Sequence, residues 1–93
     1  MDNPEYTEGR INRALNAVPD LCVAWDGDII ADDERPAFDV YWQGDDTPYW
    51  VEDGGSRFYV YTRHGSCRVE IGEARHYDDL AAILVSCVAE ENA

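Results

Sequence analysis

The chain has 93 residues, which is enough for one domain of two packed layers. Hydrophobic residues make up 45% of it, so a folded core is expected instead of disorder. Its 20 acidic residues face 7 basic ones, for a formal charge of -13. This excess argues against direct binding of nucleic acid or an anionic membrane, since both require clustered cations, and it favours a positively charged protein partner.

Membrane insertion and secretion are not expected. The longest apolar stretch, residues 80–89, is interrupted by Ser86 and is far shorter than the roughly 20 residues that span a bilayer. The N-terminal residues lack the basic and apolar regions of a secretory signal. Cys22, Cys67 and Cys87 are widely spaced and resemble no disulfide framework, so we expect three buried free thiols in a cytoplasmic protein.

An amphipathic helix is predicted near the N-terminus. Asn3 can cap it, with Pro4 at the first helical position, and Pro19 stops it. Its apolar residues recur at helical spacing, as Ile11, Leu15 and Val18.

From residue 21 to residue 71 the apolar spacing changes to two, which indicates strands. The first strand, 21–25, is expected to end in a turn at Asp26-Gly27, followed by a short strand at 29–30. The remaining strands are predicted at 38–43, 49–52, 57–63 and 67–71, with turns at 44–48, 53–55 and 64–66. Because the connections are short, the strands should form an antiparallel meander.

A second helix is predicted at the C-terminus, where Asp78 or Asp79 can cap it. Its apolar face is wide and consists of Leu80, Ile83, Leu84, Cys87 and Val88. The expected fold is therefore one α+β domain over residues 1–93: an antiparallel meander sheet of about four strands, with both helices packed on one face.

The acidic excess is concentrated in one third of the chain. Residues 20–53 carry a charge of -10, whereas residues 54–77 carry +2. Clustered like charges destabilise a fold, so the cluster indicates a function, although a solvated face adapted to salt or to genome composition is the ordinary alternative. We expect the acids at the turns to converge on one surface. The candidate partner-binding residues are Asp26, Asp28, Asp32, Asp33, Glu34, Asp39, Asp45, Asp46, Trp50, Glu52 and Asp53.

Acids two positions apart in a strand stand roughly 6.6 Å apart, and duplex DNA carries a charge every ~3.4 Å on each strand. A carboxylate array of this density fits a groove built for phosphates. In its acid-rich run from Asp26 to Asp53, its size and its α+β layout, the chain resembles small phage-encoded inhibitors that mimic DNA, of the anti-CRISPR and anti-restriction types. The resemblance implies a non-catalytic inhibitor of a defence nuclease in the host cytoplasm, acting as a monomer or small homo-oligomer.

Three other functions remain open. An immunity protein or antitoxin would cap a toxin nuclease with the same acids. An enzyme would use His64 and Cys67, which share a predicted hairpin. A single-stranded RNA-binding surface would use the arginines and tyrosines of residues 57–63 together with Arg68, although we expect these arginines to pair with the protein's own acids.

No cofactor and no metal are expected. Asp26-Gly27-Asp28 begins like a calcium loop, but Ile30 stands at the fifth position, where a ligand is needed. The chain has no glycine-rich phosphate-binding loop.

Overall fold

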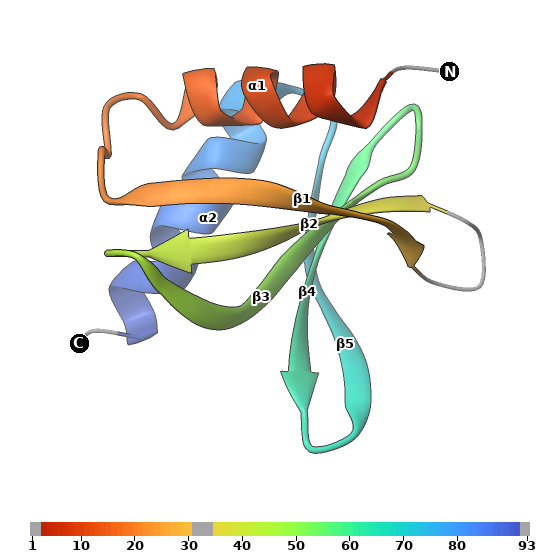
Figure 1. The fold of residues 1–93 in the computed structure, drawn as a ribbon. Helices are drawn as coiled ribbons and strands as arrows, with labels where there is room; N and C mark the ends of the chain where they lie inside the picture. Colours follow the sequence, from red (N-terminus) through yellow and green to blue (C-terminus); the bar gives the residue numbers. More distant parts are fainter. Residues whose placement is uncertain (1–2, 31–34, 92–93) are drawn as a thin grey trace.

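The chain folds into one antiparallel sheet with a helix at each end of the sequence (Figure 1). The computed structural model describes residues 3–30 and 35–91, with side chains at all of them except 26–30 and 91. The elements are α1 (Pro4–Ala14), β1 (Leu21–Ile30), β2 (Arg35–Trp42), β3 (Asp45–Asp53), β4 (Phe58–His64), β5 (Cys67–Ala74) and α2 (Tyr77–Glu91). The strands lie in the order β1-β2-β3-β4-β5. The predicted α+β meander is confirmed, with five strands instead of about four.

The turn predicted at Asp26-Gly27 is wrong, because β1 continues through it. Trp25 pairs with Phe38 and Ile29 pairs with Pro36, so β1 contains three residues between these two pairs where β2 contains one. Such an irregularity is a bulge, and a glycine inside a strand often marks one.

The β2–β3 connection is tighter than predicted. Trp42 pairs with Asp45, so only Gln43 and Gly44 form the turn. Their φ angles are 55° and 83°, and positive values at both central residues are typical of the type I′ turn that suits a two-residue hairpin. Asp45 and Asp46 therefore belong to β3 and not to a loop.

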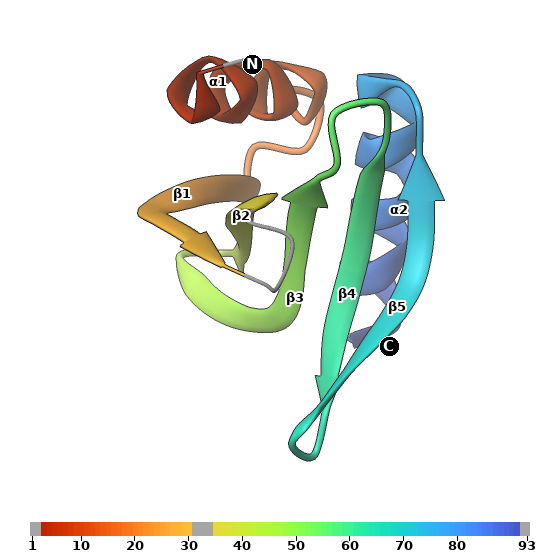
Figure 2. The same ribbon diagram turned by 90° about the vertical axis from the view of Figure 1, so that its right-hand side faces the viewer.

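The core lies between the two helices and one face of the sheet, which we call the inner face. Its largest fully buried side chains include Ile11 and Leu15 from α1, Phe38 from β2, and Leu80 and Leu84 from α2. Figure 2 shows α2 lying along β4 and β5, while α1 packs on β1. Both helices share this core, which confirms that they pack on the same face.

Side chains of α1 cover the free edge of β1. The Asn12 side-chain amide donates to the carbonyl of Val23 at 3.0 Å, and the Val23 N–H donates to Asn12 Oδ1 at 2.8 Å. The Trp25 N–H donates to Glu8 Oε2 at 2.6 Å. Edge strands otherwise present unpaired backbone groups, so α1 closes one of the two edges of the sheet.

The expectation of three buried thiols holds for only one of them. Cys87 is buried, whereas Cys22 and Cys67 are exposed. Cys22 lies between Leu21 and Val23, which both face the core, so the alternation of the strand directs it outward. Cys67 lies at the tip of the β4–β5 hairpin. Neither helix, over the residues described, has the length and apolar character needed to cross a membrane.

Candidate functional site

The meander divides the candidate acids between two ends of the sheet. Successive strands run in opposite directions, so the β2–β3 turn lies at one end of the sheet, while the end of β1, the start of β2 and the β3–β4 turn lie at the other (Figure 1). Asp45 begins β3 and Asp53 ends it, and nine strand residues have a contour length of roughly 25 Å. Asp45 and Asp53 therefore lie at opposite ends of the sheet and do not share one surface, although we expected the acids at the turns to converge.

One group gathers around the β2–β3 turn. The Gln43 N–H donates to the Asp20 carbonyl at 2.8 Å, which places Asp20 beside this turn. Asp45 and Asp46 line a hollow of ≈ 180 Å³ together with Val88 near the end of α2. We call Asp20, Asp45 and Asp46 the acidic end.

The carboxylates of the acidic end are not in ion pairs within the described structure. Among residues 3–30 and 35–91, no arginine forms an ion pair with Asp20, Asp45 or Asp46. The last turn of α2 contains no basic residue, so the negative end of its helix dipole adds to the same region.

The acidic end continues onto the outer face of the sheet through Asp46. Asp45 pairs with Trp42 and Asp46 with Tyr41, so the two carboxylates leave β3 on opposite faces. On the outer face a hollow of ≈ 330 Å³ is lined by Asp39, Asp46, Thr47, Pro48, Tyr49, Trp50 and Arg63. Three of the predicted residues, Asp39, Asp46 and Trp50, therefore lie together.

Trp50 offers a half-buried ring in this hollow. It stacks on Tyr61 with the ring centroids 5.8 Å apart. The guanidinium carbon of Arg63 also lies 5.8 Å from the Trp50 centroid, so one positive charge stands beside Asp39 and Asp46. An incoming cationic side chain would have to share this hollow with Arg63.

Glu52 does not belong to the exposed acidic surface. It is 1% exposed, on the outer face, and its Oε2 accepts from Arg68 Nη1 and from Trp50 Nε1, both at 3.0 Å. The nearest nitrogen of Arg35 lies 3.8 Å from Oε1. Strand alternation directs Glu52 away from the core, but arginines from β2 and β5 cover it.

The arginines of the outer face are largely committed within the molecule. Arg57 pairs with Glu73 at 3.0 Å and Arg68 pairs with Glu52, so the expectation that these arginines pair with the protein's own acids is confirmed for both. The guanidinium carbons of Arg35 and Arg68 lie 4.6 Å from the ring centroids of Tyr59 and Tyr61 respectively. They occupy the ring faces on which bases would stack in an RNA-binding surface.

The remaining candidate residues lie at the other end of the sheet, have side chains that are not described, or lie outside the described residues. Asp53 Oδ1 accepts from the Gly55 N–H at 2.9 Å, which stabilises the β3–β4 turn. Asp26 and Asp28 lie in β1 by their backbone, while their side chains are not described. Asp32, Asp33 and Glu34 lie outside the described residues.

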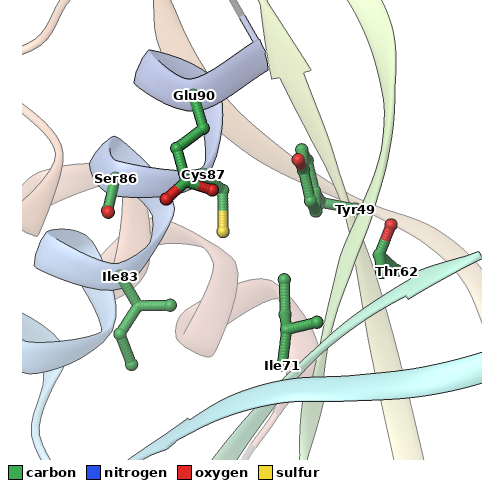
Figure 3. Close-up of a pocket in the computed structure, with 7 residues that line it drawn as sticks. All are labelled: Tyr49, Thr62, Ile71, Ile83, Ser86, Cys87 and Glu90. Atoms are coloured by element: carbon green, nitrogen blue, oxygen red, sulfur yellow. The ribbon is translucent and has the colours of Figure 1, made fainter.

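A cavity of ≈ 380 Å³ lies between α2 and the strands (Figure 3). Cys87 and Glu90 of α2 face Tyr49, Thr62 and Ile71 across it. Burial raises the pKa of the Cys87 thiol, and the nearby Glu90 carboxylate raises it further. A thiol with a raised pKa is a weak nucleophile, so this cavity lacks the activated cysteine that a thiol enzyme needs.

His64 and Cys67 form the pair that closes the β4–β5 turn, and both are exposed. An exposed hairpin tip has no walls that exclude water or hold a substrate. In the part of the chain that the structure describes, no three His, Cys, Asp or Glu side chains are grouped to hold a metal ion.

Comparison of the chain with protein-family models, with curated proteins and with solved structures finds no match. Its function must therefore be inferred from its own residues.

Proposed function

We propose that this protein is a non-catalytic inhibitor that presents carboxylates in place of phosphates to the cationic DNA-binding cleft of a nuclease, or of a CRISPR or restriction defence complex. The proposal rests on the absence of ion pairs at the acidic end within the described structure. Its three carboxylates form no ion pair with an arginine among the described residues, in a chain with a charge of -13.

An acidic region whose carboxylates are not in ion pairs attracts a cationic cleft over long range. Complementary potentials accelerate the encounter of two proteins and disfavour partners of the wrong charge. Because Asp45 and Asp46 leave β3 on opposite faces, a cleft that encloses the turn meets negative charge on both of its walls. A nucleic-acid strand likewise presents its charges to both sides of a groove.

Trp50 provides the apolar contact that charge alone does not. Interfaces derive most of their affinity from a few well-packed residues, and tryptophan is enriched among them. Trp50 shares its hollow with Asp46, so an arginine of the partner can contact the carboxylate and the ring together.

The experiment compares two charge reversals of equal size. Asp45→Lys/Asp46→Lys changes the acidic end, and Asp26→Lys/Asp28→Lys makes the same change in charge in β1, near the other end of the sheet. Each protein is immobilised and exposed to a nuclease-treated host lysate, and bound proteins are then challenged with duplex DNA at low salt. Circular dichroism confirms that both variants are folded.

We expect the wild type and the β1 variant to capture nucleic-acid-binding proteins that duplex DNA releases, and Asp45→Lys/Asp46→Lys to lose them. Rising salt should weaken the capture. Capture that survives the reversal of Asp45 and Asp46, or that DNA does not displace, would contradict the proposal. Release of a single toxin nuclease would favour the immunity-protein alternative.

A further inference from the structure

The two edge strands of the sheet, β1 and β5, differ in whether another segment bonds to their outer edge. Asn12 and Glu8 of α1 bond to the backbone of β1, whereas β5 contacts α2 on its inner face and no other described segment pairs with its outer edge (Figure 2). Residues 67–71 of β5 are all exposed, and they include two large apolar side chains, Val69 at 40% and Ile71 at 42% exposure. An open edge with exposed apolar residues is a template for another strand.

We propose that a second copy of this chain pairs with this edge, β5 against β5, around a twofold axis perpendicular to the sheet. The two sheets then become one continuous sheet, and both copies use the same surface, as a twofold interface requires. The dimer does not depend on the inhibitor function proposed above.

The backbone of β5 determines which residues would form the new hydrogen bonds. His64 and Cys67 form the closing pair of a turn that contains only Gly65 and Ser66. Hydrogen-bonded and non-hydrogen-bonded pairs alternate along an antiparallel ladder. The alternation along β5 starts from this closing pair. It directs the backbone N–H and C=O groups of Arg68 and Glu70 away from β4 and toward the open edge.

Charge then selects the register. Two of the registers that use these groups place Arg68 opposite Arg68, or Glu70 opposite Glu70, of the second copy, and like charges directly opposite destabilise a pair of strands. The third places Arg68 opposite Glu70 in both directions, so it avoids both repulsions while Arg68 keeps its ion pair with Glu52. In this register Val69 meets Val69 on the twofold axis, and Ile71 meets Cys67.

The same register brings the exposed apolar side chains together. Val69 pairs with Thr62, and both Thr62 and Ile71 line the ≈ 380 Å³ cavity beside α2 (Figure 3). The twofold axis keeps this face of both copies on one side of the joined sheet. Val69 of each copy therefore extends the apolar wall of the other and removes its exposed surface from water.

The charge of this surface favours self-association in an otherwise acidic protein. Strands β4 and β5 carry Arg63 and Arg68 against Glu70 and Glu73, so their formal charges cancel. Two copies that approach through β5 keep their acidic regions apart, and salt screens charges beyond about 10 Å at 0.1 M. The dimer should therefore be stronger at moderate salt than at low salt.

Sedimentation velocity over a wide range of protein concentration tests the dimer. We expect the wild type to approach twice its 10.5 kDa mass, and Val69→Lys, which places two ammonium groups on the axis, to stay at 10.5 kDa. Tyr6→Lys is the matched control, because Tyr6 is an exposed large side chain on α1. A monomeric wild type, or equal dimers of wild type and Val69→Lys, would overturn the proposal.

Disulfide trapping tests the register in a Cys22→Ser/Cys67→Ser background. A non-hydrogen-bonded pair on the axis has its Cα atoms ~4.5 Å apart, which is within reach of a disulfide. We expect Val69→Cys to form a covalent dimer under mild oxidation, and Arg68→Cys and Glu70→Cys to remain largely unlinked. Faster cross-linking at position 68 or 70 than at position 69 would refute this pairing.

Discussion

Arg68 holds the carboxylate of Glu52 from the outer face of the sheet, with its Nη1 3.0 Å from Oε2. Glu52 is 1% exposed, and its second oxygen, Oε1, has no hydrogen-bond partner within the described structure. A buried carboxylate is costly unless it is paired and hydrogen-bonded. Arg68, together with the Trp50 N–H, is therefore what makes this buried charge compatible with the fold.

Arg68→Met should lower the free energy of unfolding by about 2 kcal/mol, because Glu52 loses its closest cation. The loss should be smaller than that of a fully enclosed pair, since the Arg68 side chain is 41% exposed. Urea unfolding followed by tryptophan fluorescence measures it.

Two comparisons isolate the effect of the buried charge. Glu52→Met/Arg68→Met should be more stable than Arg68→Met alone, because no uncompensated charge remains. Arg57→Met breaks the exposed pair with Glu73 and should cost less than about 1 kcal/mol. Equal losses at Arg57 and Arg68 would show that the burial of Glu52 has no energetic consequence.

Asn12→Ala should destabilise the protein by about 1–3 kcal/mol, because it leaves both the N–H and the C=O of Val23 without their side-chain partner. Asn16→Ala is the control: the same substitution at an exposed asparagine, expected to change stability by no more than about 0.5 kcal/mol. Thermal unfolding of the two variants checks this. A similar melting temperature for both would mean that α1 does not stabilise the edge of β1 in this way.

The alternation of apolar residues and the short turn sequences were sufficient to predict the meander and its two flanking helices. They were not sufficient at Asp26-Gly27, where the same dipeptide suits a tight turn or a bulge inside a longer strand. Pairing with another strand decides between them, since Ile29 has Pro36, seven positions away, as a partner. A local pattern does not contain that information.

The arrangement of the candidate site likewise depends on contacts between distant residues, which a local sequence pattern does not contain. Alternation places Glu52 on the outer face, but its burial depends on Arg35 and Arg68, which come from two other strands. Asp20 joins Asp45 and Asp46 only because the β2–β3 turn and the start of β1 meet at one end of the sheet. Charge counting along the chain identified the acid-rich region, but not its division between two ends.

Gln43→Asn should stabilise the protein by a few tenths of a kcal/mol, because asparagine adopts the positive φ of 55° at this position more readily than glutamine does. Gly44→Ala should instead cost about 1 kcal/mol or more, since φ is 83° there and no neighbouring atom obstructs an added methyl group. Melting temperatures of the two variants should therefore shift in opposite directions. A destabilised Gln43→Asn would argue against a type I′ turn.

The three thiols should differ in reactivity. At neutral pH, iodoacetamide should modify the exposed Cys22 and Cys67 well before Cys87, whose pKa is raised by burial and by Glu90. Mass spectrometry of timed samples gives the order of modification. Unfolding in urea is the control, since all three should then react at similar rates. Rapid labelling of Cys87 in the native protein would contradict its burial.

The raised pKa of Cys87 also has a consequence for alkaline stability. Because the native thiol keeps its proton to a higher pH than the unfolded thiol does, the native state binds more protons above the unfolded pKa, and the free energy of unfolding falls as pH rises. Between about pH 8 and about pH 10 the wild type should lose more stability than Cys87→Ala, which lacks this group. Urea unfolding at both pH values compares the two losses directly. Since the tyrosines and the other thiols are common to both proteins, equal losses would mean that Cys87 titrates alike in the native and unfolded states.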